Sequence, residues 1–370
     1  MVDIEISPGK RARTAYSFDD ISIAPSRRTR EPSEVSINWQ IDAYSFELPL
    51  LAAPMDSVVS PESAIAIGKS GGLGVLNLEG LWSRYENPKI QLGEISSIPA
   101  EQATRRMQEL YRAPIRAELI RKRLAEIREA GVYVAAALSP QRIAEFYKTV
   151  IDAGVDIFVI RGTTVSAEHV SKAKEALNLK KFIHELDVPV IVGGCATSQS
   201  ALHLMRAGAA GVLVGFGGGA AHTTRQVLGI SVPMATAVAD VAAARREYLD
   251  ESGGRYVHVI ADGSIGKSGD IAKAIACGAD AVMLGSPLAR AESAPGRGWH
   301  WGPEAHHGEL PRGTRVYVGS SGSLEEILLG PSHSADGSMN LFGALRRAMA
   351  TSGYSDLKEF QRVEVVLSRA

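Results

Sequence analysis

The sequence is poor in the features that mark secreted, membrane-spanning and nucleic-acid-binding proteins. Its 370 residues contain only two cysteines, Cys195 and Cys277, too few for a disulfide framework. No apolar stretch approaches the roughly 18–20 residues of a membrane span, and residues 1–13 lack the apolar core of a signal peptide. The net charge is −1, so non-specific binding to nucleic acid or to an anionic membrane gains no support. These absences favour a cytoplasmic globular protein.

What the sequence does contain is an alternation of short apolar runs and helical stretches, repeated eight times. The runs are continuously apolar, as in parallel strands that are covered on both faces. Several helical stretches end in an Ala-Gly or Gly-Ala pair, and glycine just past a helix is the usual left-handed stop. Eight units favour an α/β fold of the (β/α)₈ TIM-barrel type, a single domain over 1–370, while the count alone leaves an open doubly wound sheet as the alternative.

The predicted strands are 48–54, 72–76, 132–138, 157–160, 189–193, 212–215, 257–261 and 281–284. The predicted helices include 61–70, 140–153, 198–208, 234–250 and 268–277.

Two regions break this rhythm. Residues 81–131, between the second and third strands, are rich in arginine interleaved with glutamate, which predicts a charged helical insertion with a solvated face; a binding patch is the alternative. Residues 291–322, after the eighth strand, combine histidine and tryptophan with proline and glycine, which predicts a lid-like loop over the active face. Histidine-rich loops more often hold no ligand than a metal, so no metal site is predicted.

Barrel active sites lie on the loops that follow the strands, and phosphate commonly binds after strands seven and eight. Asp262 and Gly263 follow the seventh strand, and a helix begins near Ser268. Gly263 lets the backbone approach a ligand, the amides of the helix start favour an anion, and Asp262 can accept hydrogen bonds from sugar hydroxyls. Gly285 and Ser286 supply a second donor set after the eighth strand. Two ordinary glycine turns are the alternative.

A glycine-rich loop, residues 215–225, follows the sixth strand. Ordering so many glycines costs conformational entropy, which a backbone wrapped around a ligand or ion would explain. The loop ends in His-Thr-Thr-Arg, which makes His222 and Thr224 the catalytic candidates.

Taken together, these segments resemble the IMP dehydrogenase/GMP reductase family along nearly the whole chain. The matching segments are 16–21 (YSFDDI, like TFDD), 53–58 (APMDSV, like AAMDTV), 71–75 (GGLGV, like GGIGV), 260–263 with 268–271 (IADG and SGDI, like ADGG and SGD), and 282–286 with 294–296 (VMLGS and APG).

The resemblance implies a barrel that is usually a homotetramer, or another homo-oligomer, and that acts in purine nucleotide metabolism. It implies a purine nucleoside monophosphate (IMP, XMP or GMP) as ligand, NAD or NADP as cofactor, and a monovalent cation as a further candidate. The nucleotide-binding residues that it implies are Ala53, Met55, Asp262, Gly263, Ser264, Gly285 and Ser286. Candidates for the cation loop are Gly217, Gly219 and His222, and candidates beside the base are Trp301, Gly302 and Arg312.

The main departure from the family concerns the cysteine that attacks the purine, a step that needs a thiolate. Alignment of the glycine-rich loop puts His222 at that position. Neither cysteine is expected to substitute, because Cys195 ends the fifth strand and Cys277 lies in a helix.

Other positions also depart from the family pattern. Ala220 replaces a phosphate-binding serine, Arg161 replaces an aspartate that contacts the dinucleotide's ribose, and Gly194 replaces an asparagine near the nicotinamide. Ser264 replaces a glycine, and residues 297–317 lack the family's Arg-Tyr pair. The insertion is too short for CBS domains, so regulation through such domains is not expected.

Three interpretations therefore stay open. The chain is an oxidoreductase acting on IMP, XMP or GMP, a nucleotide-binding or regulatory barrel that has lost catalysis, or an enzyme in which His222 performs acid–base chemistry. In a fourth and simpler view, His222 only fills the space of the missing thiol.

Overall fold

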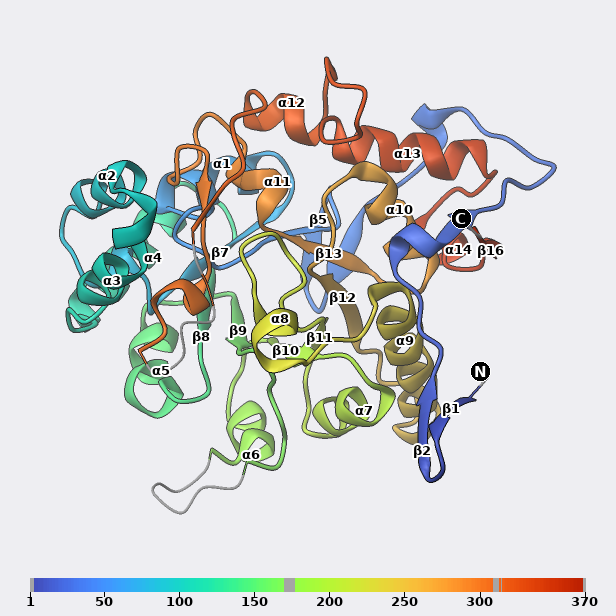
Figure 1. Ribbon diagram of the computed structural model, residues 1–370, viewed down its shortest axis with the longest axis horizontal. Helices are drawn as coiled ribbons and strands as arrows, with labels where there is room; N and C mark the ends of the chain where they lie inside the picture. The colour runs from blue at the N-terminus through green and yellow to red at the C-terminus, as the bar shows by residue number, and fades with distance from the viewer. Residues whose placement is uncertain (1–2, 170–176, 309–312, 314, 369–370) are drawn as a thin grey trace.

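The computed structural model describes residues 3–169, 177–308, 313 and 315–368. Its centre is a closed barrel of eight parallel strands in the order β10-β11-β12-β13-β6-β7-β8-β9 (Figure 1). The strands are β6 (Leu50–Ala52), β7 (Leu73–Asn77), β8 (Ala135–Leu138), β9 (Ile157–Arg161), β10 (Val190–Cys195), β11 (Gly211–Val214), β12 (His258–Asp262) and β13 (Ala281–Leu284). The predicted barrel is therefore confirmed, and all eight predicted strands are present; 281–284 is observed as predicted, and the other seven differ at one or both ends.

The first predicted strand, 48–54, shortens most. Pro49 and Pro54 flank β6, and proline has no N–H to donate to a neighbouring strand. The strand still closes the barrel, because Leu51 pairs with Met283 of β13 on one side and with Leu73 of β7 on the other.

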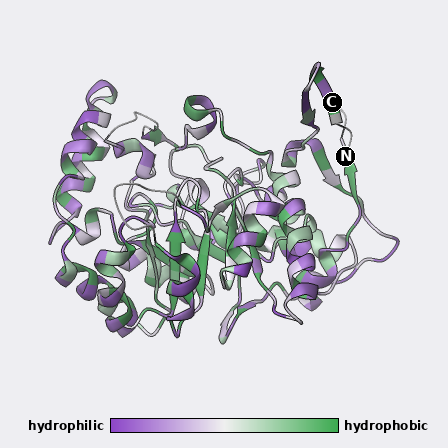
Figure 2. Ribbon diagram, turned by 90° about the horizontal axis from the view of Figure 1, so that it is seen from below, coloured by the Kyte–Doolittle hydropathy of each residue, from purple (hydrophilic) through white to green (hydrophobic). Residues whose placement is uncertain are grey.

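Helices surround the barrel and leave its apolar strands at the centre; the hydrophobic colour is concentrated there in Figure 2. The helices that follow strands are α1 (Pro61–Lys69), α4 (Ala117–Glu129), α5 (Ile143–Asp152), α6 (Leu179–His184), α7 (Ser198–Arg206), α8 (Thr224–Leu228), α9 (Met234–Glu251), α10 (Ser268–Ala276) and α11 (Ser286–Ala289). The predicted glycine stops are confirmed after α5, α7 and α10, where Gly154, Gly208 and Gly278 have positive φ. No described helix is both long and apolar enough to span a bilayer.

The charged region 81–131 contains more than an insertion. It forms η3 (Leu81–Ser83), α2 (Lys89–Ser97), α3 (Ala100–Leu110) and α4. Helix α4 belongs to the barrel, because it packs between α1 and α5. The insertion proper is the pair α2 and α3, which lies to one side of the barrel in Figure 1.

The loop after the eighth strand contains β14 (Trp299–His300), which pairs with β15 (Val316–Tyr317), and the short helix η4 (Pro303–His306) between them. The sequence did not predict the remaining elements. They are β1 (Asp3–Ser7), β2 (Lys10–Arg13), η1 (Phe18–Asp20), β3 (Ile21–Ile23), η2 (Pro32–Glu34), β4 (Trp39–Ile41), β5 (Tyr44–Phe46), α12 (Leu324–Leu328), α13 (Leu341–Thr351), α14 (Leu357–Phe360) and β16 (Val365–Leu367).

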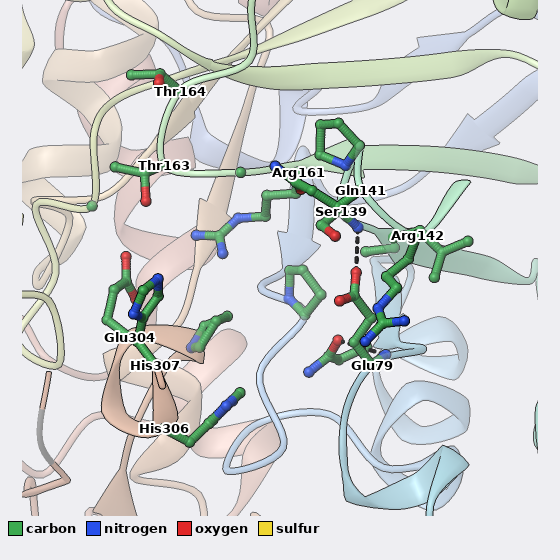
Figure 3. Close-up of a pocket in the computed structure, with 18 of the residues that line it drawn as sticks. Glu79, Ser139, Gln141, Arg142, Arg161, Thr163, Thr164, Glu304, His306 and His307 are labelled. Carbon is green, nitrogen blue, oxygen red and sulfur yellow. Dashed lines mark hydrogen bonds between the residues drawn. The ribbon is translucent and has the colours of Figure 1, made fainter. Parts of the chain in front are cut away.

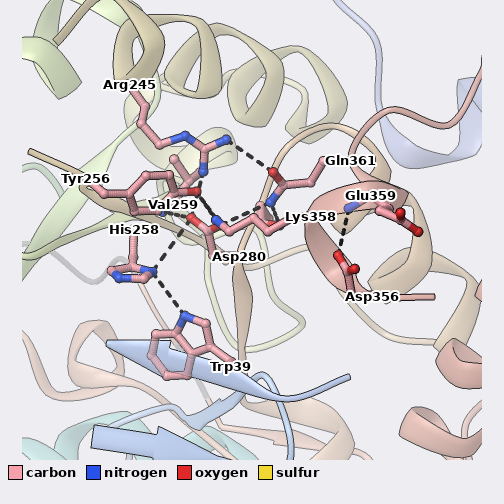
Figure 4. Close-up of polar contacts among 11 residues, drawn as sticks. Trp39, Arg245, Tyr256, His258, Val259, Asp280, Asp356, Lys358, Glu359 and Gln361 are labelled. Carbon is pink, nitrogen blue, oxygen red and sulfur yellow. Dashed lines mark hydrogen bonds and ion pairs between the residues drawn. The ribbon is translucent and has the colours of Figure 1, made fainter. Parts of the chain in front are cut away.

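At the amino ends of the strands, a buried carboxylate ties the C-terminal region to the barrel (Figure 4). Asp280, just before β13, is 1% exposed and accepts hydrogen bonds from Arg245 (2.7 Å), Tyr256 (2.7 Å) and the Val259 amide (2.8 Å). Lys358 of α14 donates to the same carboxylate at 2.5 Å. Burial alone would raise the pKa of Asp280, but Arg245 and Lys358 lower it to about 2.

We predict that Asp280→Asn lowers the free energy of unfolding by about 3–5 kcal/mol, because it leaves the buried guanidinium of Arg245 without its charged partner. The depressed pKa means that the stabilisation is complete above pH ~4 and is lost as the pH falls toward 2. Urea unfolding at pH 7 and at lower pH measures both effects. The control is Glu251→Gln, which breaks a half-exposed pair with Arg206 and should have a much smaller effect, because solvent screens that pair. Equal losses for the two variants would contradict the prediction.

Candidate functional site

Two adjoining cavities lie at the carboxyl ends of the strands. The larger cavity, of about 810 Å³, is bounded by the ends of β7, β8 and β9 and by residues 303–308. In Figure 3, Arg161 reaches into it from β9, with Glu304 and His307 on one side and Glu79 and Arg142 on the other. The smaller cavity, of about 30 Å³, lies between the loops that follow β6, β11, β12 and β13.

The smaller cavity brings together most of the residues predicted from the sequence. Its lining includes Ala53, Met55, Gly217, Gly219, His222, Asp262, Gly263, Ser264, Gly285 and Ser286. Ile265, Met283 and His300 also line this cavity, although the sequence did not predict them as site residues. Arg161 lines it too, and the sequence marked Arg161 only as a departure from the family pattern. Arg161, Gly217, His222 and Asp262 line both cavities, so these residues form the passage between them.

The glycine-rich loop packs directly on the turn that follows β12. Gly263 has φ +105°, and a Cβ there would lie 2.9 Å from the Gly218 nitrogen. The hydroxyl of Ser264, itself at φ +55°, donates to the Gly218 carbonyl at 3.1 Å. The resulting cavity is far smaller than the roughly 300–1,000 Å³ of a typical small-molecule site. A ligand of nucleotide size therefore enters only if the loop moves outward.

One predicted anion donor is already used inside the protein. The amides of Gly266 and Lys267 donate to the Asp270 carboxylate at 3.0 and 3.1 Å, and the Ser268 amide donates to the Gly337 carbonyl. Asp270, the third residue of α10 and part of its capping box, competes with an anion for these amides, and the anion site at the start of α10 stays a prediction. Of the two predicted donor sets, only the parts at 263–264 and 285–286 line the cavity.

His222 is buried beside a carboxylate. Its Nε2 lies 3.5 Å from Oε2 of Glu304, and both side chains are 7% exposed. Burial lowers the pKa of His222, and Arg161 lowers it further, while Glu304 and Asp262 act in the opposite direction with a smaller total effect. The imidazole is therefore neutral near pH 7 and can accept a proton. Its Nδ1 has no hydrogen-bond partner among the described residues.

Arg161 forms an ion pair with Asp262 across the passage. The Nε and Nη2 atoms of Arg161 both lie 3.3 Å from Oδ2 of Asp262, and the two side chains are 13% and 12% exposed. The carboxylate that was predicted to hold sugar hydroxyls thus already faces a guanidinium. A ligand whose hydroxyls bind to Asp262 must share or displace the contact between Asp262 and Arg161.

Neither thiol belongs to either cavity. Cys195 is buried and donates to the Leu213 carbonyl at 3.5 Å, and burial raises its pKa to about 12. Burial also raises the pKa of Cys277, at the end of α10, to about 11. A thiolate is the reactive form of cysteine, so neither side chain is prepared for nucleophilic attack near neutral pH.

Two predicted site residues point elsewhere. Thr224 is completely buried at the start of α8 and lines neither cavity. Trp301 is 1% exposed and donates its indole N–H to the Tyr111 hydroxyl at 2.9 Å, so its ring faces the insertion instead of a base. Gly302 does lie beside the site, since a Cβ there would be 3.5 Å from Nε2 of His222. Arg312 lies outside the described residues.

Comparison with known proteins decides the family. The model of the IMP dehydrogenase/GMP reductase domain matches residues 15–369. The chain belongs to the IMP dehydrogenase/GMP reductase family.

This family member is similar both to uncharacterized oxidoreductases and to inosine-5'-monophosphate dehydrogenases. It is 54% identical to an uncharacterized oxidoreductase of Mycolicibacterium smegmatis, over 97% of this chain and 98% of the relative. It is 30% identical to the inosine-5'-monophosphate dehydrogenase of Methanocaldococcus jannaschii, over 77% of this chain and 74% of the relative. The crystal structure of an IMP dehydrogenase/GMP reductase-like protein from Corynebacterium glutamicum superposes with a TM-score of 0.94 at 51% identity, covering 99% of this chain and 98% of that one.

For this family member we predict that iodoacetamide at pH 7 labels neither cysteine at an appreciable rate, because both thiol pKa values are raised. The variant His222→Cys should gain a thiol that reacts faster than the two native ones. Mass spectrometry of the labelled peptides measures this. Rapid labelling of Cys195 in the folded wild-type protein would contradict the prediction.

Proposed function

We propose that this protein binds a purine nucleoside monophosphate (IMP, XMP or GMP) in the smaller cavity after the glycine-rich loop moves outward. The observation that carries the proposal is the convergence of Asp262, Gly263, Gly285 and Ser286, from two strand ends, on one cavity. Backbone amides beside a hydroxyl form a polar cradle suited to a phosphate group.

The lining suggests how the nucleotide lies. In the proposed arrangement, the phosphate contacts the turn 263–264, Gly285 and Ser286, and the ribose hydroxyls contact Asp262. The base then points toward Met55, Gly302 and His222. Ala220, which replaces a phosphate-binding serine of the family pattern, is not among the residues that line the cavity.

A nicotinamide dinucleotide, NAD or NADP, is the family's expected second ligand, and the larger cavity has sufficient volume for a small-molecule ligand. The residues present do not fit the family's mode of binding it. The cation Arg161 stands where the family resemblance places an aspartate that binds the dinucleotide's ribose. Neither cavity is lined by the thiol that the family uses on the purine, so these residues give no basis for a hydride-transfer step. A monovalent cation at Gly217, Gly219 and His222, a homotetramer or other homo-oligomer, and a cytoplasmic location stay predictions.

A second candidate function is proton transfer by His222. It is favoured by the buried 3.5 Å contact between His222 and Glu304, which lies beside both cavities. A neutral imidazole with a carboxylate beside it can accept a proton, and the carboxylate stabilises the imidazolium that forms. Imidazole is a poor substitute for a thiolate in forming a covalent adduct with the purine, so acid–base chemistry suits this side chain better than nucleophilic attack.

For nucleotide binding, we predict that calorimetry detects IMP, XMP or GMP at millimolar concentration or below, with inosine binding at least about tenfold more weakly because it lacks the phosphate. Asp262→Ala should weaken binding by roughly tenfold or more. The matched control Asp152→Ala changes an exposed carboxylate on α5 and should leave the affinity unchanged. If no purine nucleotide binds at millimolar concentration, the proposal is wrong.

For proton transfer, we predict that His222→Ala abolishes any turnover of a bound nucleotide and that His222→Cys does not increase it. Because the pKa of His222 is lowered, the rate should stay constant as the pH falls from 8 through 6.5 and should decline only below that. Product analysis and nicotinamide absorbance follow the reaction. A rate increase in His222→Cys would favour thiol chemistry, and tight binding without turnover would leave binding as the function.

A further inference from the structure

The carboxylate that faces His222 belongs to a short turn with little secondary structure of its own. Glu304 lies in η4 (Pro303–His306), and within the turn the Ala305 amide donates to the Gly302 carbonyl at 3.1 Å. Trp301, just before this turn, and His306, its last residue, both contact the same side chain outside it. That side chain is Tyr111, at the end of α3 in the insertion.

Tyr111 contacts both ends of the turn. Its hydroxyl accepts the indole N–H of Trp301 at 2.9 Å, and its ring stacks on His306 with the centroids 3.6 Å apart and the planes at 5°. The same hydroxyl donates to Oδ2 of Asp56 at 2.5 Å, and the Leu81 amide donates to that oxygen at 2.9 Å. Tyr111 is therefore fixed to the barrel as well as to the turn.

A second residue of α3 holds the same turn. The side-chain amide of Gln108 donates to the carbonyl of His307 at 2.8 Å. Gln108 and Tyr111 are three positions apart, so they lie on one face of the helix. Neither residue lines the larger or the smaller cavity.

We infer that the insertion is a positioning device: α3, through Tyr111 and Gln108, holds Glu304 against His222. This inference rests on the proposed acid–base pair, and it assigns a function to helix α3 of the insertion. The charged face of the insertion faces solvent, whereas Tyr111, which is 7% exposed, carries the contacts with the site.

The test is the pKa of His222, measured by NMR on protein labelled with ¹³C in the histidine rings. Four proteins are compared: wild type, Tyr111→Phe, Glu304→Gln and the double variant. Arg161, Asp262 and His300 also face His222 and are the same in all four. Glu304 raises the pKa of His222, so a less well-held Glu304 lowers it.

We expect Tyr111→Phe to lower the pKa of His222 by roughly half a unit when Glu304 is present. In the Glu304→Gln background the same substitution should produce no shift, because the group through which Tyr111 acts has been removed. An equal shift in both backgrounds overturns the inference. It would show that Tyr111→Phe changes the pKa of His222 by loosening the site and admitting water, and not through Glu304. The absence of a shift in both also overturns it.

Gln108→Ala provides an independent variant if Tyr111→Phe does not fold, and it should lower the pKa in the same way and only when Glu304 is present. Gln102→Ala, which changes an exposed residue of α3, is the matched control and should have no effect. Nucleotide affinity is measured separately on the same proteins. A failure of nucleotide binding would therefore count against the proposed function while the pKa comparison still decides the role of α3.

Discussion

The backbone hydrogen bonds between β6 and β13 close the sheet into a barrel, and the functional site depends on this closure. Leu51 and Met283 are separated by most of the chain, yet they are paired neighbours in the sheet. Because the strands are parallel, closure puts all their carboxyl ends on one ring. Met55 thereby reaches Gly285, whose added Cβ would lie 3.3 Å from the Met55 sulfur. An open sheet would leave these two residues at opposite edges.

Within that ring, the charges differ from those that the family resemblance implies. The resemblance implies an attacking cysteine where this chain has His222, and an aspartate where it has Arg161. The two changes are physically connected, because Arg161 is among the groups that keep His222 neutral. Arg161 is in turn balanced by Asp262 at 3.3 Å. The passage between the cavities thus combines the cation Arg161, the carboxylate Asp262 and a neutral imidazole, with the carboxylate of Glu304 beside it in the larger cavity.

The active face also depends on elements that are remote in sequence. The loop after β13 supplies Glu304 and His306, and α3, from between β7 and β8, holds that loop through Tyr111. At the opposite end of the barrel, Asp280 joins α9, β12 and α14 in one buried network. The two ends of the barrel therefore differ: the network around Asp280 joins its amino ends to the C-terminal region, while the loops at its carboxyl ends line the two cavities.

The barrel and the identity of most lining residues could be predicted from the sequence, because both follow from local patterns. Strands buried on two faces need continuous apolar runs, and glycine with positive φ follows several of the helices. The family's motifs mark the loops after strands six, seven and eight. The directions in which side chains point could not be predicted in this way. Trp301 was predicted to lie beside a base and Thr224 to be catalytic, yet Trp301 donates to Tyr111 and Thr224 is completely buried. The amides of Gly266 and Lys267, just before α10, donate to Asp270, a contact that the sequence did not predict. The sequence by itself determined the fold and many of the residues that line the smaller cavity, since these depend on burial and backbone conformation. Only the tertiary structure decided the pairs His222–Glu304 and Arg161–Asp262, because each joins loops that meet only after the barrel has closed.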